Sequence, residues 1–109
     1  MTESEEFRLA VRLVILDVQD ILDEIDASRA TTRRGVENVF ESQLAALKHV
    51  ERELGKIELN QRLRALTQAT VGVLPPLLTS VEKSNRDAPP QSVGKCRKSI
   101  DALVGQLYR

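Results

Sequence analysis

Apolar residues recur at alternating spacings of three and four along most of the chain, and this pattern limits the fold more than any other feature. In the first segment they occupy positions 7, 11, 14, 18, 21 and 25, and similar runs lie within 36–54, 59–81 and 93–107. Such spacing places the apolar side chains on one face of an α-helix. The sequence therefore predicts an all-α protein, and the short connections between the four helices favour an up-down-up-down four-helix bundle.

Capping residues predict where the first two helices begin. Thr2 and Glu5 fit a capping box, in which the hydroxyl and the carboxylate bind free amide groups of the first turn. The first helix is therefore expected over residues 3–28. Thr31 and Thr32 are candidate caps for the second helix.

Glycine and proline positions predict the other connections. Gly55 is expected to adopt a left-handed conformation and to begin a tight reversal, because glycine has no side chain to clash at positive φ. In the alternative, the second helix continues directly into the third. Residues 84–90 are rich in turn formers, which indicates a loop, and the fourth helix is expected to start near Pro90 or Gln91.

The third helix contains two consecutive prolines, Pro75 and Pro76. Each lacks an amide hydrogen, and its ring crowds the preceding turn. We therefore expect a kink or a break at Leu74, with the helix bending or restarting at the prolines, because the apolar register continues beyond them.

The chain length limits the number of domains. With 109 residues and 12.2 kDa, the chain is expected to form a single helical-bundle domain over 1–109. Its 15 Leu, 11 Val and 5 Ile residues can build a core without a tryptophan. The apolar pattern still continues where the sequence stops, which leaves open that this is the N-terminal domain of a longer protein.

The charge is balanced overall but unevenly distributed. Sixteen basic and sixteen acidic residues cancel, which argues against a nucleic-acid partner, whose phosphates require an excess of positive charge. Residues 1–27 hold eight acids and two bases, a net charge of minus six, so the remainder carries plus six. Either the acidic first helix packs beside basic neighbours within one fold, or the same asymmetry drives association between molecules.

Several features bear on the location of the protein. The N-terminal segment resembles no secretory signal, and no run approaches the roughly 20 apolar residues of a transmembrane span. A cytoplasmic location is therefore expected. The basic residues Lys95, Arg97 and Lys98 allow at most weak peripheral contact with an anionic membrane surface.

Residue types that carry out catalysis are sparse. His49 is the only histidine, and it is expected to be exposed and paired locally with Glu53. Cys96, the only cysteine, lies on the apolar face of the fourth helix and is expected to be a small buried side chain. Neither is accompanied by the further groups that a catalytic or metal site requires, so we expect no enzyme activity, no cofactor and no small-molecule substrate.

Acidic residues cluster on the first helix. Asp17, Asp20 and Glu24 share one face, with Asp23 and Asp26 nearby. A regular helix cannot wrap enough oxygen ligands around a calcium ion, so this face is expected to be solvated.

Apolar residues exceed what one bundle needs. More apolar residues surround the prolines, and the first helix carries a second apolar set that widens its main stripe: Leu9, Leu13, Leu16 and Leu22, with Ile15. Because a bundle of this size buries about one stripe per helix, the surplus is expected to contact a partner. The residues expected to form the partner-binding surface are Val11, Leu13, Ile15, Leu22, Leu74, Leu77 and Leu78.

The segment Asp-Val-Gln-Asp-Ile-Leu-Asp-Glu-Ile at 17–25 resembles an acidic segment of the N-terminal coiled-coil domains of plant immune receptors. That resemblance implies self-association and contact with neighbouring receptor domains. The same residues and the four-helix layout also resemble focal-adhesion-targeting and vinculin-type bundles. The resemblance covers nine of 109 residues, and we assign the chain to neither family.

Two functions are consistent with these patterns. The first is a non-enzymatic interaction or oligomerisation module that docks a partner helix or a second copy through surplus apolar helix surface. The second is an N-terminal signalling or cell-death-type bundle whose first helix is released to act on membranes.

Overall fold

Four α-helices make up most of the computed structural model, which describes residues 2–27, 32 and 34–108. They are α1 (Glu3–Asp26), α2 (Val36–Leu54), α3 (Gln61–Ser84) and α4 (Gln91–Leu107). No strand occurs within the described residues. The predicted all-α class and the number of helices are therefore confirmed.

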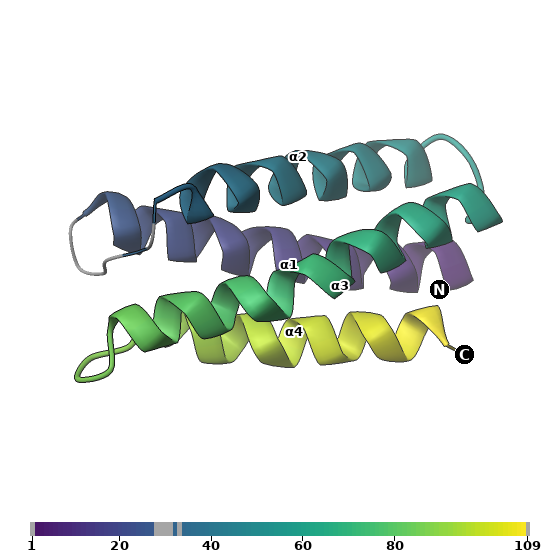
Figure 1. Ribbon diagram of the computed structural model, residues 1–109. Helices are drawn as coiled ribbons and strands as arrows, with labels where there is room; N and C mark the ends of the chain where they lie inside the picture. The colour runs from purple at the N-terminus through teal and green to yellow at the C-terminus, as the bar shows by residue number, and fades with distance from the viewer. Residues whose placement is uncertain (1, 28–31, 33, 109) are drawn as a thin grey trace.

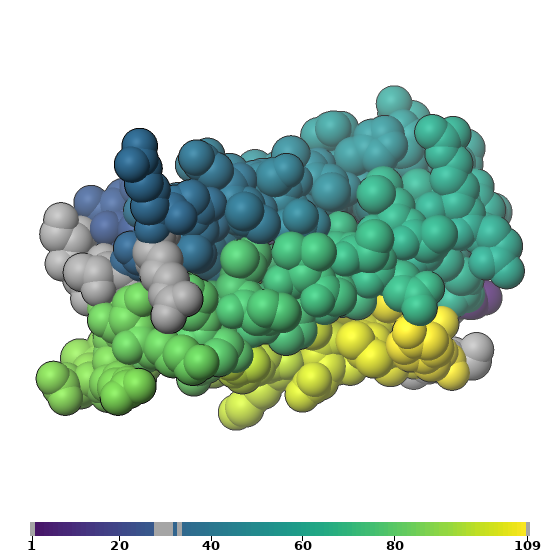
Figure 2. Space-filling model, in the orientation of Figure 1, coloured from purple at the N-terminus to yellow at the C-terminus, as the bar shows by residue number. Residues whose placement is uncertain are grey.

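The helices lie side by side in an elongated bundle of 42 × 21 × 19 Å. α1 packs against α2 and α4, and α3 packs against the same two helices. Both chain ends and the α2–α3 connection lie at one end of the bundle, and the α3–α4 connection lies at the other (Figure 1). On the face shown in Figure 2, side chains fill the gaps between α2, α3 and α4, and α1 is visible only at the edges.

The predicted apolar stripes form one continuous core. Its largest fully buried side chains come from all four helices, which confirms that apolar residues spaced by three and four face the core. Within the described residues, every buried side-chain nitrogen or oxygen atom has a hydrogen-bond partner. The buried apolar residues of the stripes include Phe7, Val14, Val18, Ile21, Phe40, Leu47, Val50, Leu63, Val81, Val93, Ile100 and Leu103.

The start of α1 is confirmed, whereas the start of α2 differs from the prediction. α1 begins at Glu3, and the Thr2 hydroxyl accepts a hydrogen bond from the Glu5 amide at 3.2 Å. α2 begins at Val36 after Gly35, whose φ of 90° lies in the left-handed region that favours glycine. Thr32 is therefore not its cap, and Thr31 lies outside the described residues. α1 ends at Asp26, two residues before the expected end at residue 28.

The end of α2 corrects a second expectation. Gly55 has a φ of −76° and ψ of −13°, so it is right-handed and not left-handed. The carbonyls at this end are bound locally, because the Gly55 amide donates to Glu51 and Arg52, and the amides of Lys56 and Ile57 donate to Glu53. Arg8 of α1 adds a hydrogen bond from its Nε to the Glu51 carbonyl at 3.2 Å. The helices are nevertheless separate, since α2 ends at Leu54 and α3 starts after Asn60, whose side chain accepts from the Leu63 amide at 3.0 Å.

The expected break at Leu74 is absent, because α3 runs without interruption through Pro75 and Pro76. Leu74 and Leu78, on either side of the prolines, are both fully buried. Burying each leucine contributes about 1.5 to 3 kcal/mol, which offsets much of the cost of about 3 kcal/mol per proline. Packing therefore keeps the segment helical despite its local preference.

Candidate interaction site

The seven residues predicted to bind a partner occupy three different environments. Four are fully buried inside the bundle, where a partner cannot reach them while the bundle is closed: Val11, Ile15, Leu74 and Leu78. Two are partly buried and pack against the core: Leu22 and Leu77. Leu13 is exposed, with 52% of its surface accessible. The structure thus does not bring the seven residues together on one surface.

Leu13 instead belongs to a row of three exposed leucines on α1. Leu9 is 53% exposed and Leu16 is 45% exposed. Their spacing of four and three residues aligns them along one side of the helix, over about 10 Å. Leu9 and buried Val11 are two positions apart, which turns their side chains about 200° from each other around the helix axis. We call Leu9, Leu13 and Leu16 the outer leucine stripe; it lies opposite the core-facing side of α1.

The edge of the outer leucine stripe next to α2 holds two arginines that α2 already binds. Arg12 forms an ion pair with Glu51 at 3.3 Å, and Arg8 donates to the backbone carbonyl of the same residue. Together with Glu5 and Leu9, these three residues line a hollow of about 330 Å³. This edge is therefore hollowed, and its positive charges have partners within the chain.

The edge next to α4 is acidic. Its carboxylates were expected to be solvated, but two of them bind side chains of α4. The Ser99 hydroxyl donates a hydrogen bond to Asp17, and the Ser92 hydroxyl donates one to Glu24. Ser92 is buried, and both aspartate and glutamate are only partly exposed. These acids help to join α1 to α4, because each carboxylate accepts a hydrogen bond from a serine of the facing helix.

A second hollow, of about 430 Å³, opens between the end of α1 and the start of α4. Its charged lining consists of Asp20, Asp23 and Glu24 from α1 and Lys95 from α4. Asp20 and Asp23 are exposed and form no ion pair within the described residues. We call this the acidic hollow; its three carboxylates outnumber its one cation.

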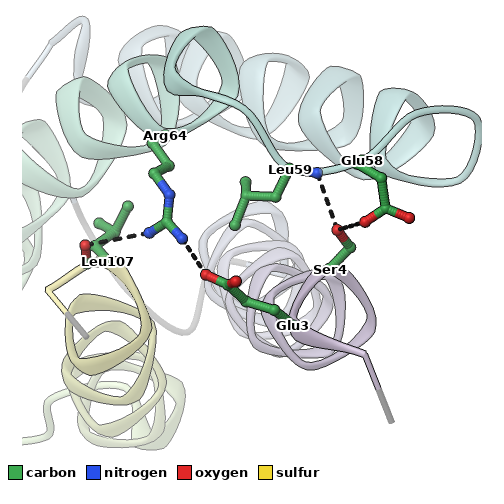
Figure 3. A network of polar contacts seen from close by, with 6 residues as sticks. All are labelled: Glu3, Ser4, Glu58, Leu59, Arg64 and Leu107. Carbon is green, nitrogen blue, oxygen red and sulfur yellow. Dashed lines mark hydrogen bonds and ion pairs between the residues drawn. The ribbon is translucent and has the colours of Figure 1, made fainter.

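Polar contacts fix the first turn of α1 to the rest of the bundle. The Ser4 hydroxyl accepts a hydrogen bond from the Leu59 amide at 2.9 Å and donates one to the Glu58 carboxylate at 2.8 Å (Figure 3). Ser4 is buried although it is polar, because both of these partners satisfy its hydroxyl. The connection between α2 and α3 is thereby tied to α1.

Arg64 of α3 extends this network to α4. Its guanidinium group pairs with Glu3 of α1 and donates to the Leu107 carbonyl at 3.4 Å (Figure 3). The same group lies 5.9 Å from the centre of the Phe7 ring, within the range of a cation–π contact. The N-terminal end of α1, which precedes the outer leucine stripe, is therefore held by contacts with α3 and with the α2–α3 connection.

Cys96 is buried, as the sequence predicts. The pKa of its thiol is raised from 9.0 to about 12, mainly by burial and also by nearby Asp17, while Arg97 acts in the opposite direction. Because the thiolate is the reactive form of cysteine, this neutral thiol acts as a small core side chain.

His49 is exposed on α2, but it forms no hydrogen bond or ion pair with Glu53 in the part of the chain that the structure describes. The expected local pair is thus not formed. Across residues 2–27, 32 and 34–108, no three His, Cys, Asp or Glu side chains gather in a way that could hold a metal ion. No helix within these ranges is long and apolar enough to cross a membrane.

Comparisons of the chain with protein-family models, curated proteins and solved structures find no match. The chain is therefore assigned to no family.

Proposed function

We propose that this protein is a non-enzymatic protein–protein interaction or oligomerisation module. It docks a helix of a partner, or a second copy, through the outer leucine stripe of α1. The observation that carries this proposal is the position of the stripe: three leucines, each about half exposed, lie in a row on the side of α1 that faces away from the core. Exposed apolar rows of this kind mark interaction surfaces.

The stripe needs a functional explanation because the fold does not require it. The buried side of α1 already supplies the contacts to α2 and α4. Leucine on the opposite side adds no comparable packing, and it exposes apolar surface to water at a cost in solubility. Docking of a partner helix would explain why these three exposed positions hold leucine.

We also propose two details of the fold: the up-down-up-down order of the helices and a bend in α3. The up-down-up-down order is supported by the packing of α1 against both α2 and α4. A bend at Pro75 and Pro76 is supported by the loss of two backbone hydrogen bonds at adjacent positions of α3.

The test compares the wild-type chain with Leu13→Ser and with a matched control, Val39→Ser. Val39 is exposed at 37% but lies on α2, away from the outer leucine stripe. Molar mass is measured by light scattering over a concentration series, and binding is measured against a displayed library of amphipathic helical peptides. We expect association or peptide binding in the wild type and in Val39→Ser, with a clear loss in Leu13→Ser.

Two results would contradict the proposal. The first is a wild-type chain that stays monomeric and retains no peptide from the library. The second is binding or association that Leu13→Ser leaves unchanged. Circular dichroism of both variants establishes that each is folded before the comparison is made.

A further inference from the structure

The outer leucine stripe is too small to hold a partner by apolar contact alone. It extends over about 10 Å, whereas each partner in a stable protein interface buries about 800 Å². Three half-exposed leucines supply only a small part of such an area. The neighbouring surface must therefore contribute, and its charge determines which partners fit.

The charge around the stripe is negative. Residues 1–27 carry a net charge of minus six. Glu5 is exposed before the stripe, and Asp20 and Asp23 are exposed after it. These three acids form no ion pair within the described residues.

This net charge already includes the two positive charges of α1, and both belong to arginines that are bound by α2. Arg12 is paired with Glu51, and Arg8 is bound to the backbone carbonyl of the same residue at the end of α2. Both arginines are thus directed to the α2 side of the stripe. The side next to α4 presents an excess of carboxylates.

Three of these carboxylates lie together in the acidic hollow. Asp20 follows Leu16 by four residues, about one helical turn or 6 Å along α1. In a partner helix that lies along the outer leucine stripe, the turn that follows the leucine contacts would therefore lie over the acidic hollow. The hollow, of about 430 Å³, is lined by three carboxylates and one lysine, so a basic side chain there would lie near an excess of negative charge.

We propose that the outer leucine stripe and the acidic hollow together bind an amphipathic helix of a protein partner whose apolar face is flanked by lysine or arginine. The apolar side chains of that helix lie on the leucines, and a basic side chain about one turn beyond them enters the acidic hollow. This inference rests on the proposed docking function and specifies the chemistry of the partner.

The same charges disfavour the other occupants of this surface. A second copy packed through the stripe would place two helices of net charge minus six against each other. An anionic lipid surface would be repelled in the same way. A basic helix is the occupant that the surface charge complements.

The experiment uses two synthetic peptides of about 18 residues, or about 27 Å as helices. Both carry leucines spaced by four and three, and they differ only in having lysine or glutamate beside the leucines. Fluorescence anisotropy measures the binding of each peptide to the full chain at about 50 mM and about 500 mM NaCl. Because screening weakens exposed charge pairs, we expect the lysine peptide to bind at least about tenfold more weakly at the higher salt concentration.

Variants separate the two parts of the site. The double variant Asp20→Asn/Asp23→Asn removes two carboxylates from the acidic hollow, and it is expected to weaken binding of the lysine peptide about tenfold. Leu13→Ser is expected to abolish binding. Asp101→Asn, at an exposed position of α4 that does not line the acidic hollow, is the matched control and is expected to change nothing.

The outcomes distinguish the two proposals. Equal binding of both peptides, lost in Leu13→Ser, overturns the basic-partner inference while the docking function stands. The inference also fails if neither peptide binds while the wild-type chain self-associates through Leu13. Binding of neither peptide by a chain that also remains monomeric contradicts both proposals.

Discussion

The two sides of α1 can be tested by two substitutions only two residues apart. Ile15 is fully buried in the core, and Leu13 is 52% exposed on the outer leucine stripe. Replacing buried isoleucine by alanine removes apolar contacts and leaves a cavity, which costs about 2 to 5 kcal/mol. We therefore expect Ile15→Ala to lower the free energy of unfolding by that amount.

Leu13→Ala is expected to cost about 1 kcal/mol or less. Full burial of a leucine contributes about 1.5 to 3 kcal/mol, and only about half of the Leu13 surface is removed from solvent. Alanine is also at least as favourable as leucine in a helix, which reduces the loss further.

Urea unfolding followed by circular dichroism measures both effects. With an m-value of about 1.5 kcal/mol/M, Ile15→Ala shifts the midpoint by roughly 1 to 3 M and Leu13→Ala by less than about 0.7 M. Similar shifts for the two variants would refute the description of α1 as a helix with one buried and one free side. Repeating the titration at two protein concentrations shows whether any effect of Leu13→Ala comes from association.

Three further measurements test local features. Because the raised Cys96 pKa means that the folded chain holds this proton more tightly, unfolding free energy should fall as pH rises from 9.0 towards about 12, relative to Cys96→Ala. Pro76→Ala restores an amide donor at an exposed helix position, so urea unfolding should show a gain of about 2 kcal/mol. Gly35→Ala should lose about 1 to 2 kcal/mol in the same assay, because φ is 90° there although the site has space for a methyl group.

The core was largely predictable from the sequence because burial follows helical periodicity. Residues at spacings of three and four, such as Phe7, Val14 and Val18, must share one side of a helix whatever surrounds them. The same local reasoning predicted the Thr2 cap, since a capping hydrogen bond involves residues three apart in the chain.

The end of α2 and the continuity of α3 depend on backbone geometry and packing that residue type alone does not specify. Gly55 does not need positive φ, because the amides of Gly55, Lys56 and Ile57 bind the carbonyls of the last turn in a right-handed conformation. α3 continues through its prolines without a break because the leucines on either side are held by the core. Residue propensity alone predicts neither outcome.

The site could be predicted only in part for the same reason. Apolar residues on α1 exceed one stripe, but spacing alone does not show which of two overlapping sets faces the core. Ile15 and Leu16 are neighbours in sequence, yet one is buried and the other is exposed, because α2 and α4 cover only part of the α1 surface. The signal for the outer leucine stripe was its offset of two residues from the strongest stripe, as between Leu9 and Val11.

The second function, in which α1 is released to act on membranes, requires a large free energy to separate α1 from the bundle. α1 buries seven large apolar side chains between α2 and α4: Phe7, Val11, Val14, Ile15, Val18, Ile21 and Ile25. At about 1.5 to 3 kcal/mol each, their exposure costs roughly 10 to 20 kcal/mol, as much as the whole stability of about 5 to 15 kcal/mol of a typical domain. Release of α1 is thus nearly equivalent to unfolding the bundle.

A membrane would have to supply that energy to a helix whose charge opposes binding. The net charge of minus six in residues 1–27 repels anionic headgroups. We therefore expect no dye leakage from anionic vesicles at neutral pH, and no increase when Ser4→Ala weakens the contacts that hold the first turn of α1. Leakage by the wild-type chain that Leu13→Asp abolishes would contradict this argument, because it would show that the outer leucine stripe enters lipid despite the surrounding acids.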